Sequence, residues 1–344
     1  MSDSHISIRG LYKIFGKRPA SALTKVHAGV EKDALLNDHG HVLGLQDINL
    51  EIPRKKIQVI MGLSGSGKST LIRHFNRLIE PTAGEVWVDG QNVLALNKPE
   101  LMQFRREKMS MVFQRFALLP HRTIIENVRY GLDIQGVSDD DAKARAIHWI
   151  ERVGLAGQED QYPGQLSGGM QQRVGLARAL ATDADILLMD EAFSALDPLI
   201  RTEMQNILLE LQRELHKTIV FITHDLDEAL KLGDNIAILR DGAIVQTGAP
   251  EDIVLKPADD YVADFMKDIN RARVLTLASM VRPDGDAVLE LPVATTLEDA
   301  CLALCDEPTG QARVIDEGGN FKGYVELHDL IRAQARPNVA SFDI

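Results

Sequence analysis

The sequence predicts an α/β fold, in which buried strands alternate with helices around a sheet. Three apolar runs are typical of strands covered on both faces: IQVIM (57–61), ILLMD (186–190) and TIVFIT (218–223). After the first run, LIRHFNRLI (71–79) has apolar residues at helical spacing, and a long helix is expected over 199–216. Ligands bind at the carboxyl edge of such sheets, so the residues that follow each run are candidates for a site.

Shorter elements complete the first 250 residues. A strand and a turn are expected at 5–16, and apolar residues alternate over 42–56 as in a strand. Between them, residues 17–41 are polar, show no clear period and indicate an insertion. EVWVDG (85–90) and SMVFQ (110–114) predict two further strands.

Helices are expected on either side of a break. Residues 123–160 are largely helical in pattern, and Asp139 suits a helix start by its charge. The pattern is interrupted at 162–164, after which LSGGMQQRVGLARALA (166–181) leads into a helix. NIAILRDGAIVQTG (235–248) predicts a hairpin with an Asp-Gly turn.

The composition is that of a globular chain with an acidic excess. Its 344 residues are 45% hydrophobic and carry a formal net charge of −12, which argues against a general nucleic-acid binder because such proteins need a basic face. No apolar run approaches a membrane span and no signal peptide is recognised, so we expect a soluble, cytoplasmic protein. Cys301 and Cys305 have no second Cys or His pair nearby, which favours two buried residues over a zinc site.

The stretch GLSGSGKST at 62–70 fits the phosphate-loop pattern G-x-x-x-x-G-K-[ST]. Its glycines let backbone N–H groups wrap a phosphate, and the following helix presents its N-terminus to the anion. The alternative is a plain glycine-rich turn, but the strand before and the helix after are the context that the motif requires. The nucleotide-binding residues predicted here are Gly62, Leu63, Ser64, Gly65, Ser66, Gly67, Lys68, Ser69 and Thr70.

Further polar residues follow the other predicted strands. Asp190 is expected to hold Mg²⁺, and Glu191 beside it can polarise the attacking water. His224 and Gln114 follow strands whose ends lie at the same sheet edge, and the amide of Gln114 suits contact with Mg²⁺ or its water. Catalytic roles are therefore predicted for Lys68, Gln114, Glu191 and His224, and metal binding for Ser69, Gln114 and Asp190.

Taken together, these motifs resemble the ATP-binding-cassette (ABC) ATPases, which are phosphate-loop NTPases. The resemblance covers residues 5 to about 250 and rests on GLSGSGKS, the glutamine of FQ, LSGGMQQR, LLMDE, SALD and the histidine of THD. It implies ATP and Mg²⁺ as cofactors, and two subunits packed head to tail so that Ser167, Gly168 and Gly169 cap the ATP held by the partner. LSGG precedes a helix but lacks the lysine and the hydroxyl of a complete phosphate site, which agrees with that role.

The same resemblance implies two further positions. Asp197 of SALD is expected at the dimer seam, where it would link the two sites. Phe15 of KIFG matches the aromatic residue that stacks on adenine. Because the 17–41 insertion directly follows Phe15, Tyr12 stays open as the alternative, and either ring could instead be a core aromatic.

Longer stretches are similar to the ATPase subunits of importers for glycine betaine, proline and choline-type compounds: LYKIFGK, MGLSGSGKST, NRLIEPTAGEVWVDG, MVFQRFALLPH and MDEAFSALDPLIRTEMQ. Such importers pair two ATPase chains with two transmembrane permease subunits and, usually, a substrate-binding protein that the ATPase does not touch. The resemblance implies a peripheral protein at the cytoplasmic face of the inner membrane that hydrolyses ATP to drive uptake of quaternary ammonium compounds. An importer ATPase for another small solute and a soluble, non-transport ABC ATPase are the alternatives.

Two domains are expected. Residues 1–270 would form the ABC ATPase domain, with a helical subdomain at about 115–165 that grips the permease. Residues 275–344 are acidic and predict a helix that starts near Thr296, the strands ARVID and KGYVEL, and a final helix. This segment resembles a single CBS-type unit where related chains often carry two. A sensor that pairs across the dimer and a stabilising cap are both open.

Overall fold

The structure, a computed structural model, describes residues 4–114, 117–267, 269–316 and 318–334. The chain divides into two units, Met1–Gly248 and Ala249–Ile344. The division falls earlier than the boundary near 271 that the sequence indicates. One reason is that Glu251 Oε1 accepts the N–H of Thr276 at 2.9 Å, which ties the residues after Gly248 to the C-terminal segment.

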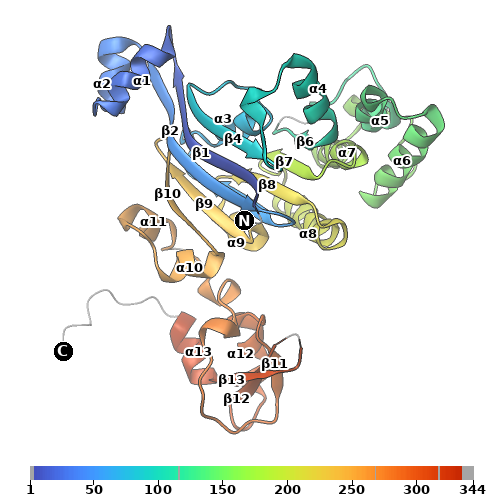
Figure 1. The fold of residues 1–344 in the computed structure, drawn as a ribbon. Helices are drawn as coiled ribbons and strands as arrows, with labels where there is room; N and C mark the ends of the chain where they lie inside the picture. Colours follow the sequence, from blue (N-terminus) through green and yellow to red (C-terminus); the bar gives the residue numbers. More distant parts are fainter. Residues whose placement is uncertain (1–3, 115–116, 268, 317, 335–344) are drawn as a thin grey trace. The chain divides into compact units, whose positions relative to one another are not determined.

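The first unit contains two sheets (Figure 1). One has the strand order β2-β1-β4-β5, and the other has the order β10-β9-β3-β8-β7-β6. The strands are β1 (Ser4–Phe15), β2 (Val42–Pro53), β3 (Ile57–Met61), β4 (Ala83–Val88), β5 (Gln91–Asn92), β6 (Met109–Val112), β7 (Ile186–Asp190), β8 (Thr218–Thr223), β9 (Asn235–Arg240) and β10 (Ala243–Gly248).

The second of these sheets confirms the strands predicted from the three apolar runs. β3, β7 and β8 are buried at every residue, and β8 pairs in parallel with both of the others. β6 and β9 extend the parallel pairing, and β10 returns antiparallel to β9 through the predicted turn at Asp241 and Gly242. The carboxyl ends of these five parallel strands therefore lie in a row, and predicted site residues lie at the ends of four of them: β3, β8, β7 and β6.

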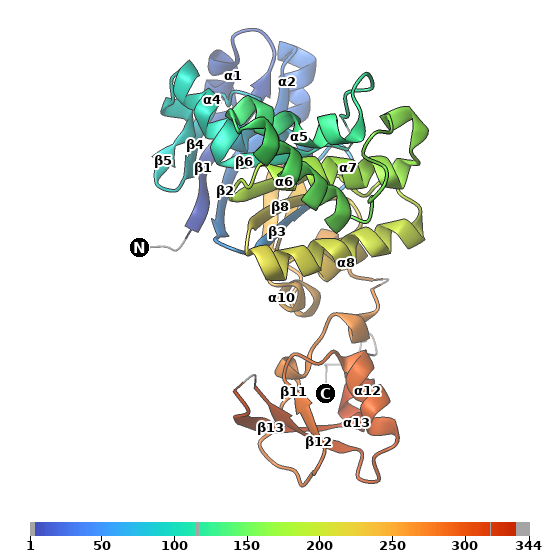
Figure 2. The ribbon, with the colours of Figure 1, turned by 90° about the vertical axis from the view of Figure 1, so that its right-hand side faces the viewer.

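Helices of the first unit fall into those near the sheets and a separate group. α5, α6 and α7 contact one another around an apolar core that includes Ile124, Ile150 and Val174, and Figure 2 shows them side by side. α5 and α6 lie within the expected helical subdomain, whose first residues, 115–116, are outside the described ranges. The helices are α1 (Pro19–His27), α2 (Lys32–His39), α3 (Lys68–Phe75), α4 (Lys98–Glu107), α5 (Ile124–Gln135), α6 (Asp139–Arg152), α7 (Gly168–Ala181), α8 (Pro198–Leu215) and α9 (Leu226–Leu232), with 3₁₀ turns at Val93–Ala95 and Pro163–Gln165.

The insertion at 17–41 forms two helices that the sequence analysis did not predict. α1 and α2 lie at one end of the β1–β2 pair (Figure 1). Their buried side chains, Ala22, Val26 and Leu35, pack on Ile14 and Leu43 of the strands. Helices of nine and eight residues with so few buried positions leave no apolar period that could be read from the sequence.

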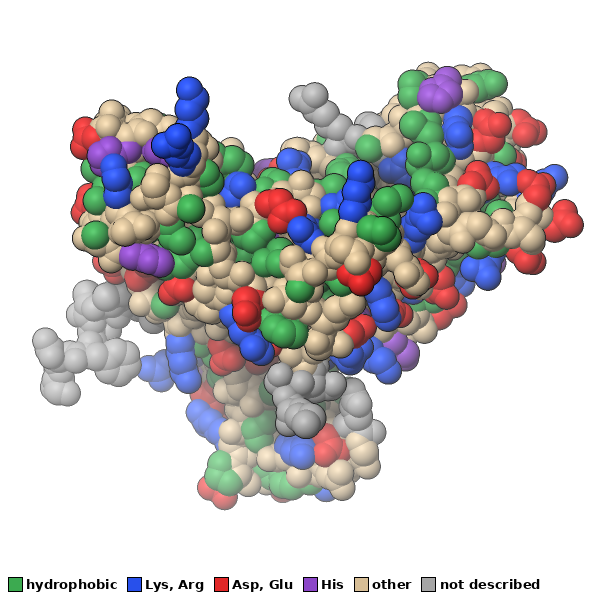
Figure 3. Space-filling view, turned by 45° about the horizontal axis from the view of Figure 1, so that its top comes forward, with side chains coloured by type: hydrophobic (Ala, Val, Ile, Leu, Met, Phe, Trp, Pro, Cys, Tyr) green, Lys and Arg blue, Asp and Glu red, His purple; other side chains and the backbone are tan. Residues whose placement is uncertain are grey.

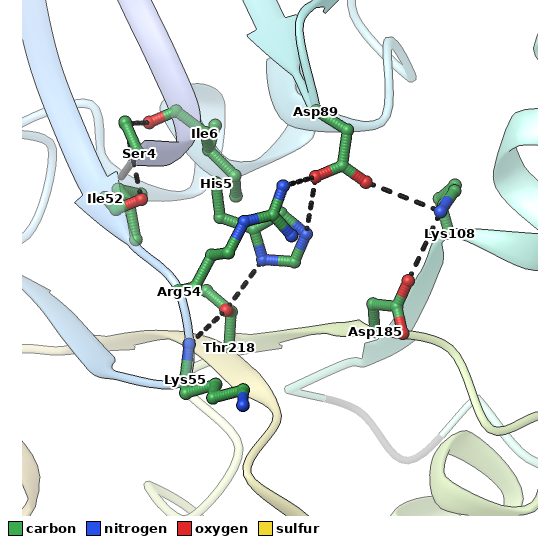
Figure 4. Close-up of polar contacts among 10 residues, drawn as sticks. All are labelled: Ser4, His5, Ile6, Ile52, Arg54, Lys55, Asp89, Lys108, Asp185 and Thr218. Atoms are coloured by element: carbon green, nitrogen blue, oxygen red, sulfur yellow. Dashed lines mark hydrogen bonds and ion pairs between the residues drawn. The ribbon is translucent and has the colours of Figure 1, made fainter. Parts of the chain in front are cut away.

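A polar cluster joins the two sheets near the amino end of β8 (Figure 4). His5 of β1 is 4% exposed, and its Nδ1 lies 2.7 Å from Oγ1 of Thr218, the first residue of β8. Its Nε2 lies 3.2 Å from Asp89 Oδ1, and Asp89 also pairs with Arg54 and Lys108. Burial lowers the pKa of His5, although the Asp89 carboxylate opposes this effect.

The second unit contains a three-stranded sheet of order β11-β12-β13 and two helices in mutual contact, α12 and α13. α12 follows Thr296, whose Oγ1 accepts the N–H of Asp299, so the predicted helix start is confirmed. Both predicted strands are confirmed, whereas β11 was not expected. The elements are α10 (Pro250–Leu255), α11 (Asp260–Phe265), 3₁₀ turns at Arg271–Arg273 and Leu277–Ser279, β11 (Glu290–Pro292), α12 (Leu297–Cys305), β12 (Gln311–Ile315), β13 (Phe321–Glu326) and α13 (Leu327–Gln334).

The two cysteines differ in exposure. Cys301 is partly buried and its Sγ lies 3.1 Å from Gln334 Nε2, whereas Cys305 is exposed. The expectation of two buried cysteines is therefore wrong for Cys305. Both lie on α12, whose buried residues are Leu297, Ala300 and Leu304, and Cys305 lies outside this buried face.

Charge of both signs is visible on the face drawn in Figure 3, where basic and acidic side chains are interspersed. Across the described ranges, every helix is too short or too polar to span a bilayer.

Candidate nucleotide-binding site

The phosphate loop lies between β3 and α3, as the sequence predicts. Its path depends on glycine, because Gly67 has φ +104° and a Cβ there would lie 2.8 Å from the carbonyl oxygen of Gly44. At Gly62 a Cβ would lie 2.2 Å from the carbonyl oxygen of Leu239. α3 begins at Lys68, so the N–H groups of its first turn open onto the loop and suit an anion.

Lys68 is the buried cation of this loop. It is 4% exposed, and its Nζ donates to the carbonyl oxygens of Gly62 (2.8 Å) and Leu63 (3.0 Å). Burial lowers the pKa of Lys68, while the carboxylates of Glu191 and Asp190 act to raise it. An ammonium group has three N–H donors, so one remains for a phosphate oxygen.

Asp190 ends β7 and is 3% exposed. Its Oδ1 accepts from Ser69 Oγ at 2.7 Å, and its Oδ2 accepts from Arg73 Nη2 at 3.2 Å. Carboxylate and hydroxyl oxygens are ligands that Mg²⁺ prefers. Two of the three predicted metal ligands, Ser69 and Asp190, are in direct contact. The third, Gln114, contacts Glu191 in this structure.

Glu191 is the residue at which the predicted catalytic groups meet. Its Oε2 accepts from Gln114 Nε2 at 2.8 Å, and its Oε1 lies 3.6 Å from His224 Nδ1 and 3.8 Å from Lys68 Nζ. The backbone fixes this carboxylate, since Glu191 has φ +47° and its N–H donates to the carbonyl oxygen of Ile222 at 3.1 Å. Three predicted residues, from three separate segments, thus converge on the carboxylate of the fourth.

The LSGG turn lies at the start of α7 and packs against α8. Ser167 caps α7, with Oγ accepting the N–H of Met170 at 3.3 Å, and a Cβ at Gly169 would lie 2.8 Å from Ile200 Cγ2 on α8. Asp197 caps α8 by accepting the N–H of Ile200 at 3.1 Å. In the part of the chain that the structure describes, no hydrogen bond or ion pair joins this turn to the phosphate loop.

The two candidate adenine aromatics differ in exposure. Phe15 is 41% exposed, and the Nζ of Lys13 lies 4.9 Å from its ring centroid. Tyr12 is partly buried against the α1–α2 core, with its ring edge-on to His27. A flat face for stacking is therefore more accessible on Phe15.

Two arginines near the site were missed by sequence reasoning. Arg73 lies one helical turn after Ser69, and this spacing alone could have placed it beside the same carboxylate. Arg201 on α8 pairs with Asp225, the residue after His224, at 3.3 Å. Nothing in the local sequence signals that second pair, because it depends on how two helices pack.

A phosphate loop with a carboxylate pair and a histidine at the ends of adjacent parallel strands defines the class of phosphate-loop ATPases. A family model described as ABC transporter matches residues 45–194. This match covers less than half of the chain, but a transport ATP-binding protein of Listeria monocytogenes, described below, is 55% identical and is covered over 71% of its length. The chain therefore belongs to this family and is an ATP-binding ABC ATPase.

Three relatives indicate the kind of transport system to which similar chains belong. The chain is 55% identical over 282 residues to the glycine betaine/carnitine transport ATP-binding protein GbuA of Listeria monocytogenes, covering 82% of this chain and 71% of GbuA. It is 45% identical to the glycine betaine/proline betaine transport system ATP-binding protein ProV of Escherichia coli, covering 94% and 81% of the two chains. It is 43% identical to the trimethylamine N-oxide transport system ATP-binding protein TmoW of Pelagibacter ubique, covering 96% and 97%.

A solved structure shares the fold. A dimeric ATP-binding cassette in a post-hydrolysis state, bound to ADP and Pi, is 32% identical with a TM-score of 0.61, and the match covers 71% of this chain and 98% of that one. The match supports the assignment of the nucleotide-binding fold.

Proposed function

We propose that this chain is the ATP-hydrolysing subunit of an importer for quaternary ammonium compounds of the glycine betaine type. The observation that carries the hydrolytic role is the carboxylate of Glu191, which Gln114, Lys68 and His224 surround. The substrate class rests on the transport systems to which GbuA and ProV belong. The ATPase chain itself need not touch the solute.

The oxygen ligands near the phosphate loop fit Mg²⁺. Ser69 Oγ and Asp190 Oδ1 are 2.7 Å apart, and Asp190 is buried where water competes little. Bound Mg²⁺ would neutralise charge on the phosphates during transfer. Arg73 holds the second oxygen of Asp190 and so fixes the carboxylate for this role.

Other residues of the chain bind the phosphates, orient the attacking water and stack on the base. The first-turn N–H groups of α3 and Lys68 bind phosphate oxygens. Glu191 orients water for in-line attack, and His224, whose Nδ1 lies 3.6 Å from Glu191 Oε1, positions that carboxylate. Phe15, which presents the more exposed ring, stacks on adenine.

Two copies of the chain complete the site. Ser167, Gly168 and Gly169 start α7 against α8, beside Asp197, and they cap the nucleotide of the partner copy. Changing Ser167 to Arg should leave ATP binding by the single chain intact while ATP-driven dimerisation and hydrolysis are lost. If the single chain instead lost ATP binding, the turn would act within its own chain.

The permease docks in the groove between α4, β6 and the helical group. A cavity of about 300 Å³ lies there, and its lining includes Arg105, Arg106, Tyr130 and Ile134. Tyr130 and Ile134 are exposed apolar side chains beside basic ones, which suits an apolar permease segment that carries an acidic residue. Ile134→Asp should abolish co-purification with the permease and keep the ATPase activity of the free chain. Leu36→Asp, which changes an exposed side chain on α2, should keep both co-purification and ATPase activity.

Transport measures the substrate class directly. With its permease and binding protein in vesicles, the chain should support uptake of labelled glycine betaine, and Glu191→Gln should abolish uptake while ATP still binds. Trimethylamine N-oxide is the competing solute, because TmoW matches this chain over almost its whole length. Uptake of trimethylamine N-oxide without glycine betaine would refute the proposed substrate class and leave the ATPase role standing.

The C-terminal segment adds a regulatory candidate. Its sheet of three strands with α12 and α13 is compatible with one CBS-type unit, and we propose that it modulates transport. Deleting 275–344 should alter how transport responds to ionic strength. An unchanged response would leave the segment a stabilising cap.

A further inference from the structure

Two polar side-chain contacts connect α8 to α9. On α8, Arg201 and Gln205 lie one turn apart; Asp225 caps α9, and Glu228 lies in its first turn. Arg201 Nη1 lies 3.3 Å from Asp225 Oδ2, and Gln205 Nε2 donates to Glu228 Oε1 at 3.1 Å. These two contacts hold the helices in a fixed register.

Arg201 contacts both functional segments at once. Its Nη2 donates to the carbonyl oxygen of Leu196, within SALD, at 3.1 Å. Its Nη1 pairs with Asp225, which directly follows His224. The planar guanidinium has several donors in a rigid arrangement, so one side chain can bind both acceptors and fix their separation.

The second contact, between Gln205 and Glu228, makes the connection between the helices stiff. Gln205 and Glu228 are 6% and 5% exposed. Burial raises the pKa of Glu228, while hydrogen bonds from Thr223 and Gln205 act in the opposite direction. Buried, hydrogen-bonded side chains cannot move independently, so a displacement of the start of α8 is carried to α9.

We propose that Arg201 is a positioning residue that couples the SALD segment to His224. This inference rests on the proposed function, because it concerns the same ATP hydrolysis. When a partner copy moves SALD, Arg201 moves Asp225 with it and brings His224 into place beside Glu191. Among the described residues, no hydrogen bond or ion pair joins Arg201 to the phosphate loop or to Glu191, so we assign its effect to these two segments.

The first test is steady-state ATP hydrolysis by the full chain carrying Arg201→Gln. We expect kcat to fall about tenfold, while KM for ATP and the affinity of the single chain for ATP stay within about twofold. Arg213→Gln is the matched control, because Arg213 is an exposed arginine on the same helix. It should leave all three quantities unchanged.

The second test isolates the ion pair. Asp225→Asn keeps a side-chain oxygen that can cap α9 but removes the charge that pairs with Arg201. The Arg201→Gln, Asp225→Asn double variant should lose no more kcat than the worse of the two single variants. Because residues in direct contact couple whatever their role, the melting temperatures of the variants decide between coupling and a merely structural role. A merely structural role would lower the melting temperature in step with activity.

Each outcome has a definite meaning. Unchanged kcat in Arg201→Gln, additive losses in the double variant, or a parallel loss of ATP affinity would overturn the coupling role alone. No ATP hydrolysis by the unchanged protein would overturn the proposed function and this inference together. A lower kcat with intact ATP binding and non-additive losses supports both.

Discussion

Thr218 at the start of β8 offers a stability test of the join between the two sheets. Its hydroxyl accepts the N–H of Lys55 at 2.8 Å and lies 2.7 Å from His5 Nδ1 (Figure 4). Thr218→Val replaces this hydroxyl by a methyl group of similar size. The buried imidazole of His5 then loses a partner that no water can replace, since His5 is 4% exposed.

The magnitude follows from that exposure. A buried polar group left unpaired costs about 1–3 kcal/mol, whereas the Lys55 N–H belongs to an exposed residue and can turn to water. We therefore expect Thr218→Val to lower the free energy of unfolding by about 2 kcal/mol. For a unit of this size such a loss lowers Tm by about 4–8 °C.

The measurement is urea unfolding at pH 7.5 followed by tryptophan fluorescence. Trp87 and Trp149 both lie in the first unit and report on it. Thr218→Ser keeps the hydroxyl and is the control, which should recover most of the loss. If Thr218→Val unfolded within 0.5 kcal/mol of the unchanged protein, the hydroxyl would not hold the two sheets together.

Four further predictions concern the same unit. The pKa of His5 is lowered in the folded chain, so the unfolded chain binds more protons as the pH falls below about 6.5. The free energy of unfolding should therefore drop between pH 7 and 5. In urea titrations, His5→Gln should flatten this pH dependence. Gly67→Ala should abolish nucleotide binding in a fluorescent-ATP titration, since its φ of +104° and the nearby Gly44 carbonyl admit no Cβ; retained affinity would contradict the loop geometry. Ser69→Ala should raise the Mg²⁺ concentration needed for hydrolysis, and an unaltered Mg²⁺ titration would remove Ser69 from the metal site. Phe15→Ala should weaken ATP binding about tenfold by loss of base stacking, and equal binding of ATP by both forms would return the role to Tyr12.

The strands and the phosphate loop could be predicted because their signals are local. IQVIM is buried at every residue, and the glycines of the loop are required by backbone angles that the motif encodes. The meeting of Gln114 and His224 at Glu191 was predictable one step further, from the rule that parallel strands share an edge.

Other features depend on contacts that no short stretch encodes. α1 and α2 have too few buried positions to show a period, and β11 is a three-residue strand that exists by pairing with β12. Arg201 has its role only because α8 packs beside α9. The place of Gly169 against Ile200 likewise arises from tertiary packing.

The tethering of Lys68 has a thermodynamic consequence. A free lysine side chain carries about 2 kcal/mol of rotamer entropy, and the hydrogen bonds from its Nζ to Gly62 and Leu63 remove much of that freedom when the chain folds. A nucleotide that binds this ammonium therefore costs less side-chain conformational entropy, and more of the interaction free energy contributes to affinity. Because the tethered Lys68 exists only in the folded chain, nucleotide binding there stabilises the fold, and the melting temperature should rise with the logarithm of the nucleotide concentration above its Kd.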